Sequence, residues 1–95
     1  MQKDFYEPPG KEGQGGAFYV KEGENTIQPI IELINQWKGS IISSIDYHPQ
    51  GHCSFLDTEF NQCAGPYPPH CIWGTEGAKL SEGIVNALNE SKNKK

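Results

Sequence analysis

The sequence has no arginine, no long apolar run and few apolar residues of any kind. All eight basic residues are lysines, and the net charge is −4. Nucleic-acid-binding domains normally present a basic patch with forked arginine contacts, so the composition argues against that class. No stretch approaches the roughly 18–20 apolar residues of a membrane span, and the N-terminal residues contain no apolar signal region. We therefore expect a cytoplasmic protein with neither a nucleic-acid nor a membrane partner.

Apolar residues make up only 35% of the 95 residues, whereas glycine and proline contribute 11 and 7 residues. Leu, Ile, Val and Phe together number 19, about one fifth of the chain, which is the level at which compact folding becomes doubtful. The length allows one domain, but this composition can bury only a thin core, which makes an independent fold marginal. Three cysteines without a secretion signal predict reduced thiols in place of a disulfide framework.

Two helices and one long loop are expected from local patterns. Residues 7–16 contain two prolines and four glycines, which predicts a loop. Residues 26–38 predict a helix because apolar residues recur there at i, i+3, i+4, i+7 and i+10. Thr26 is the expected N-cap of that helix, and Gly39 is expected to end it. Ser81, Ile84, Val85 and Leu88 predict a final short helix capped by Ser81.

Residues 41–45 form a short run rich in β-branched side chains, Ile-Ile-Ser-Ser-Ile. A run of this kind directly after a helix predicts a buried strand of a parallel sheet. Helix and strand together would form half of a βαβ unit, so we expect an α/β fold. The first strand of that unit would have to precede the loop, yet only five residues stand before Tyr6.

All three histidines and all three cysteines lie between residues 46 and 71. Asp46, His48 and His52 follow the expected strand directly, at the edge where open α/β sheets bind ligands. One carboxylate and two imidazoles suit a divalent ion such as Zn²⁺, Fe²⁺ or Mn²⁺. His70 follows two prolines that stiffen its approach, as a fixed ligand would require. Spacing alone leaves a metal site and ordinary solvated histidines as equal alternatives.

The cysteines form no C-x-x-C pair and no zinc-finger spacing. Each of Cys53, Cys63 and Cys71 is therefore expected to be a small buried hydrophobic residue. Cys71 is a poor nucleophile for a base at His70, because neighbouring side chains on an extended chain point apart.

Four segments, in order, resemble the nicotinamidases of the isochorismatase-like (cysteine hydrolase) family. The first two are similar to the tail of the family's Asp-x-Gln-x-Asp-Phe opening and to its Gly-Gly-(Ala/Ser)-Leu: Met1-Gln2-Lys3-Asp4-Phe5 and Gly15-Gly16-Ala17-Phe18. The last two are similar to Asp-Trp-His-Pro-x-x-His-x-Ser-Phe and Trp-Pro-x-His-Cys-Val-x-Gly-Thr-x-Gly-Ala: residues 46–55 and residues 67–78. The last two segments together are specific to this family, and the ordered combination of all four is hard to reach by chance.

The resemblance implies a three-layer α/β/α, Rossmann-like hydrolase fold with a parallel sheet. Residues 1–95 would be the N-terminal portion of one such domain, truncated and loop-rich, with its metal-binding segment at about 46–78. The implied reaction converts nicotinamide to nicotinate and ammonia in NAD salvage. In this family a cysteine thiolate attacks the amide while an aspartate and a lysine transfer protons. The divalent metal, zinc first with iron or manganese as alternatives, holds the pyridine nitrogen and water.

Carried over by position, the resemblance implies Asp46, His48 and His70 as metal ligands. His52 matches a histidine that binds the metal in some members and only lies near it in others. Phe5 and Tyr67 match rings that line the nicotinamide pocket, where tyrosine replaces the usual tryptophan.

The catalytic groups of the family have no counterpart in this sequence. The aspartate would stand just before Met1, and the lysine and cysteine would follow later segments; Lys79 lies in the wrong motif. We therefore expect a nicotinamidase-like fragment without activity of its own, completed by the rest of its domain or by a homo-oligomer. The alternatives are a non-catalytic metal-binding or partner-completing module and a related cysteine hydrolase with another amide substrate.

Overall fold

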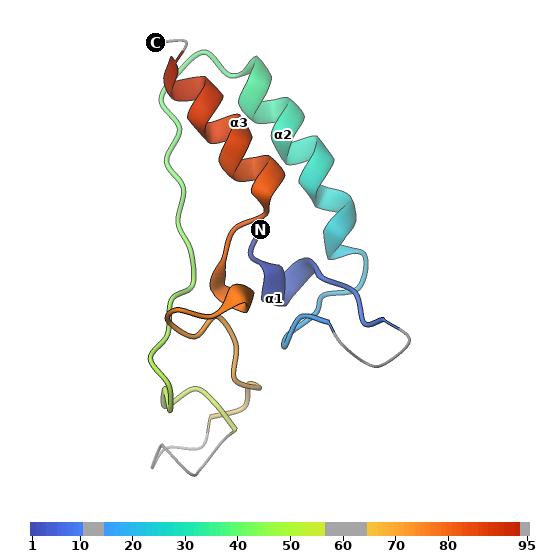
Figure 1. Cartoon of the computed structure of the whole chain (residues 1–95), viewed down its shortest axis with the longest axis vertical. Helices are drawn as coiled ribbons and strands as arrows, with labels where there is room; N and C mark the ends of the chain where they lie inside the picture. Colours follow the sequence, from blue (N-terminus) through green and yellow to red (C-terminus); the bar gives the residue numbers. More distant parts are fainter. Residues whose placement is uncertain (11–14, 57–64, 94–95) are drawn as a thin grey trace.

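The computed structural model describes residues 1–10, 15–56 and 65–93 of the chain. Helices α2 and α3 lie side by side, and the short α1 lies beneath them near the N-terminus (Figure 1). The connection after α2 descends along α3 as an extended segment before the chain folds into loops (Figure 1). The helical elements of the described residues are α1 (Lys3–Tyr6), η1 (Gly23–Thr26), α2 (Ile27–Gln36), η2 (Glu76–Ala78) and α3 (Glu82–Asn93).

Helix α2 confirms the helix predicted from the apolar repeat, with shorter ends. Thr26 belongs to the preceding 3-10 turn, and its hydroxyl donates to the carbonyl of Gly23 at 2.7 Å, so its side chain does not cap α2. The helix ends before Gly39, because Trp37 already has an extended backbone. The indole N–H of Trp37 donates to the carbonyl of Ser40 at 3.0 Å, and this bond holds the turn of the chain that follows α2.

The helical core is a small cluster between α2 and α3. Ile34, Ile84 and Ala87 are buried there, and partly buried apolar side chains pack around them. Gly83 allows the two helices to approach, since a Cβ at this position would come within 2.9 Å of Ile31 Cδ1. Helix α3 confirms the final helix predicted after Ser81, whose carbonyl accepts the Val85 N–H at 3.0 Å.

The predicted strand at residues 41–45, and with it the α/β three-layer fold, is wrong. The described residues form a small, helical, loop-rich structure that contains no β-strand. Pairing between extended segments is limited, within this part of the chain, to three isolated bridges: Gln2 with Leu80, His48 with Ile72 and Phe55 with Tyr67. A β-branched run favours an extended backbone, but a ladder also needs a second extended segment alongside it. Residues 41–45 are surrounded by helices and loops among the described residues, so they have no strand to pair with, and Ile42 remains 95% exposed.

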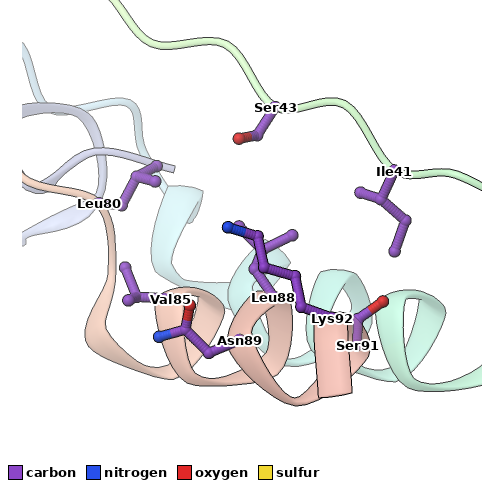
Figure 2. Close-up of a pocket in the computed structure, with 8 residues that line it drawn as sticks. All are labelled: Ile41, Ser43, Leu80, Val85, Leu88, Asn89, Ser91 and Lys92. Atoms are coloured by element: carbon purple, nitrogen blue, oxygen red, sulfur yellow. The ribbon is translucent and has the colours of Figure 1, made fainter. Parts of the chain in front are cut away.

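The extended segment after α2, residues 41–45, contacts the helical cluster through Ile41 and leaves a cavity between itself and α3. Ile41 and Ser43 face Leu80, Val85 and Leu88 across a cavity of about 240 Å³ (Figure 2). Residues at alternate positions of an extended chain point to the same side, which explains why 41 and 43 share this cavity. The segment therefore presents one side to the helix and leaves the opposite side, with Ile42, in solvent.

Candidate metal centre

Two loops bring the predicted ligands together. The His48 N–H donates to the carbonyl of Cys71 at 2.9 Å, and the Trp73 N–H donates to the carbonyl of His48 at 2.9 Å. These bonds form the parallel bridge between His48 and Ile72. They place the segment that carries Asp46 and His48 beside the segment that carries His70.

The side chains of Asp46, His48 and His70 converge. Oδ2 of Asp46 lies 3.7 Å from Nε2 of His48 and 3.7 Å from Nε2 of His70. One ligand atom from each residue lies within 4.8 Å of the other two. Tetrahedral zinc with ligand bonds of about 2.0–2.2 Å needs ligand atoms roughly 3.3–3.6 Å apart. Both 3.7 Å separations come close to this requirement, and the ligand atoms that lie up to 4.8 Å apart would have to approach each other. His70 is 6% exposed whereas the Asp46 side chain is 51% exposed, so one side of the group is open.

The tautomer of His70 suits a ligand. Its Nδ1 lies 2.7 Å from the carbonyl oxygen of Pro68. A carbonyl can only accept, so Nδ1 carries the proton and a neutral ring keeps its lone pair on Nε2, which faces Asp46. A backbone carbonyl that orients a histidine in this way is typical of metal-binding histidines.

His52 lies beside this group but outside the set of converging ligand atoms. Its ring centroid is 4.6 Å from that of His48. Its Nδ1 accepts the Ser54 N–H at 3.2 Å and lies 2.7 Å from the Ser54 hydroxyl oxygen. The part of the chain that the structure describes thus brings three of the four predicted ligands together and places the fourth next to them.

Aromatic rings surround His70. Phe5 and Tyr67, the two predicted pocket residues, have ring centroids 5.5 and 6.5 Å from the His70 ring. Phe18 lies between them, 5.0 Å from His70, 6.1 Å from Phe5 and 5.6 Å from Tyr67. Phe55 is fully buried beneath His48 and His70. Phe18 is thus a pocket residue beyond the two predicted ones, and it ends one of the four segments similar to the nicotinamidases.

The cysteines differ from one another. Cys71 is fully buried, which confirms its expected role as a small hydrophobic residue, and Cys53 is exposed, so the same prediction was wrong there. Cys63 lies outside the described residues. Burial, followed by the negative charges of Asp4 and Asp46, raises the pKa of the Cys71 thiol to about 12. A thiol that stays protonated at neutral pH is a poor nucleophile.

Two N-terminal polar residues that sequence analysis did not single out contact the ligand-bearing loops. The Gln2 side chain bonds to both the N–H and the carbonyl of Asp46. The Asp4 carboxylate accepts the backbone N–H of Cys71 at 2.7 Å and that of Ala17 at 3.0 Å. Their only sequence signal was their place in the first resembling segment.

The chain is similar over most of its length to a curated protein. It is 34% identical over 79 residues to the nicotinamidase of Escherichia coli (strain K12), a match that covers 70% of this chain and 37% of that protein. The chain therefore spans little more than a third of the length of this relative, and the similarity to this hydrolase is distant and partial. No family model and no solved structure matches the chain. Among the described helices, none is long and apolar enough to cross a membrane.

Proposed function

We propose that this chain is the metal-holding portion of a nicotinamidase-like amidohydrolase, which converts nicotinamide to nicotinate and ammonia in NAD salvage in the cytoplasm. Residues 1–95 would belong to one domain, with the metal-binding segment at about 46–78. The observation that carries the proposal is the convergence of Asp46, His48 and His70, with the His70 lone pair directed at the other two. The partial similarity to the E. coli nicotinamidase supports the choice of substrate.

The donor set fits a catalytic rather than a structural metal. Two imidazoles and one carboxylate suit zinc, iron or manganese, and three protein ligands leave coordination positions for other molecules. When bound, the ion supplies a Lewis acid that holds the pyridine nitrogen and a water molecule. Asp46 lies on the exposed side of the group, so substrate can approach past its carboxylate. His52 stands next to this opening and would orient a water molecule or add a ligand.

The rings around His70 support an aromatic substrate. Phe5, Phe18 and Tyr67 offer faces and edges to a pyridine ring held near the ligand atoms. Tyr67 is nearly half exposed, so it would cover the substrate from the solvent side. Offset or edge-to-face contacts of this kind contribute roughly 0.5–1.5 kcal/mol per ring pair.

None of the residues that we assign to this site is a nucleophile. The buried thiol of Cys71 stays protonated near neutral pH, and exposed Cys53 has no base assigned to it. In this proposal the attacking thiolate and its proton-transfer partners are supplied from outside the assigned site. We therefore expect the 95-residue chain to bind the metal and nicotinamide without hydrolysing the amide.

Titration with Co²⁺, followed by its visible absorption, tests the metal site. We expect one equivalent to bind in a low-coordinate geometry, and Zn²⁺ to displace it. Asp46→Asn should abolish this spectrum, whereas Glu32→Gln, at an exposed acidic residue on α2, should leave it unchanged. A wild-type chain that binds no Co²⁺, or an Asp46→Asn variant that binds as well as the wild type, would overturn the proposal.

Nicotinamide binding tests the substrate. Added to the Co²⁺-loaded chain, nicotinamide should shift the visible bands because its ring nitrogen enters the coordination sphere. Benzamide has the same shape but no ring nitrogen, so it is the matched control and should leave the bands in place. Equal shifts with both compounds would contradict ligation by the pyridine nitrogen.

A further inference from the structure

The N-terminal segment contacts both loops that carry the proposed metal ligands. Gln2, which is 4% exposed, lies against Asp46, 44 residues further along the chain. Asp4 lies against Cys71, which directly follows His70 and is 67 residues away in sequence. The two contacts come from positions two residues apart, one directly before helix α1 and one within it.

Gln2 holds the peptide groups of Asp46 as a paired strand would. Its Oε1 accepts the Asp46 N–H at 2.8 Å, and its Nε2 donates to the Asp46 carbonyl at 2.6 Å. The second Nε2 proton goes to the carbonyl of Ala78 at 2.7 Å, so the buried carboxamide is well satisfied. Within the described residues, the backbone of the preceding segment 41–45 makes no hydrogen bond. Gln2 therefore holds the Asp46 peptide groups directly, two residues before the bridge at His48.

Asp4 holds the other ligand-bearing loop at a strained point. Cys71 has a φ of 48°, a left-handed conformation that a side chain other than glycine rarely adopts. The Asp4 carboxylate accepts the N–H of this residue at 2.7 Å, and hydrogen bonds to an ionised acceptor are the strong ones. Gly77 makes room for this carboxylate, because a Cβ there would collide with it. The turn that follows His70 is thus held by Asp4.

We propose that Gln2 and Asp4 form a clamp that sets the separation of Asp46 and His70 and thereby the affinity of the metal site. Neither side chain would touch the metal, so both are positioning residues. The inference rests on the proposed metal site. Removing a hydrogen-bond partner that orients a metal ligand typically lowers metal affinity by about 10–100-fold, and we expect a loss of this size when the clamp is removed.

The variants Gln2→Met and Asp4→Leu test the clamp, since each keeps the approximate shape of the side chain and removes its hydrogen bonds. We expect both to weaken Co²⁺ binding, Gln2→Met by roughly 10–100-fold, and to change the shape of the visible bands. Ile84→Val in the α2–α3 core is the control, because it lowers the melting temperature without touching the site. The inference would be overturned if both clamp variants bound Co²⁺ with the affinity and visible bands of the wild type. It would also be overturned if Ile84→Val, at the same loss of melting temperature, changed affinity and bands as much as the clamp variants do.

Amide hydrogen exchange in the metal-free chain separates this inference from the proposed function. The clamp predicts slow exchange at the amides of Asp46 and Cys71, at least roughly tenfold slower than at Ile42 and Ser44. Gln2→Met should release the Asp46 amide, and Asp4→Leu should release that of Cys71. A chain that binds no metal but shows this protection would overturn the proposed metal site and keep the clamp. Exchange at Asp46 and Cys71 as fast as at Ile42 would overturn the clamp, whatever the metal does.

Discussion

At the residue scale, the candidate site depends on which nitrogen of each histidine carries a proton. His70 donates from Nδ1 to the carbonyl of Pro68, which leaves Nε2 as the ligand atom. His52 shows the opposite arrangement, because its Nδ1 accepts the Ser54 N–H and a neutral ring then carries its proton on Nε2. The sequence offers both histidines as candidate ligands, but the hydrogen bonds at Nδ1 give the two rings different tautomers.

This difference predicts unequal effects of removing the two imidazoles. His70→Gln should lower Co²⁺ affinity by roughly 100-fold or more, since it removes a ligand that is fixed and buried. His52→Gln should lower it by less than about tenfold, because only a neighbour of the ligand His48 is changed. Isothermal titration of both variants measures the two constants, and equal losses would contradict the tautomer argument.

Cys71 predicts a pH dependence of stability. Its pKa is raised from 9.0 to about 12 by burial, so above pH 9 the unfolded chain loses a proton that the folded chain keeps. The unfolded state then binds fewer protons, and the free energy of unfolding falls as pH rises from 9 towards 12, by no more than about 1.4 kcal/mol per pH unit. Below pH 9 this contribution is constant.

Urea unfolding at pH 8 and pH 10.5 measures this dependence. Cys71→Ala is the matched control, because it keeps every lysine and tyrosine that also titrates in the range. The wild type should lose more stability between the two pH values than the variant does. Parallel losses would show that Cys71 does not remain protonated in the folded chain.

At the scale of secondary-structure elements, α2 and α3 form a helical hairpin whose stability depends on very few side chains. Ile34, Ile84 and Ala87 are its buried apolar residues, and Gly83 permits the close approach to Ile31. The extended segment 41–45 contributes Ile41 to this packing, whereas a cavity separates Ser43 from α3 and Ile42 is in solvent. Helix–helix contact, rather than strand pairing, therefore organises this part of the molecule.

Two isoleucine substitutions test whether helix–helix packing contributes more to stability than the side chain of Ile42 does. Ile84→Ala should lower the free energy of unfolding by about 2–5 kcal/mol, because it opens a cavity between α2 and α3. Ile42→Ala removes the same atoms from a side chain that is 95% exposed, and should change stability by less than about 0.5 kcal/mol. Far-UV circular dichroism melts compare the two, and a large loss for Ile42→Ala would show that its side chain is buried in solution.

At the scale of the whole molecule, the chain is elongated, with extents of 47 × 30 × 19 Å, and its apolar groups are divided between two places. One is the α2–α3 cluster, and the other is the ring cluster around Phe55, His48 and His70. Large apolar side chains such as Leu33, Trp37 and Ile42 are exposed. Two small clusters joined by loops give a low free energy of unfolding, as expected for a chain with few apolar residues.

Metal binding should therefore stabilise the fold measurably. A ligand that binds only the folded chain adds about 2.7 kcal/mol at 100 times its dissociation constant. We expect Zn²⁺ to raise the melting temperature, EDTA to reverse the rise, and Asp46→Asn to remove it. A melting temperature that responds to Zn²⁺ equally in the wild type and in Asp46→Asn would show that the ion binds elsewhere.

The sequence by itself determined the features that depend on near neighbours. The apolar repeat in α2 and the start of α3 directly after Ser81 follow from residues within a few positions of each other, as do the prolines before His70. Tertiary structure alone decided the absence of a sheet in the described residues, the exposure of Cys53 and the place of Phe18 beside His70. It also decided that Gln2 and Asp4 hold the ligand-bearing loops.

The physical reason is that helical periodicity is a local property of the chain. Strand pairing, burial and hydrogen bonds that span 44 or 67 residues depend instead on how distant segments meet.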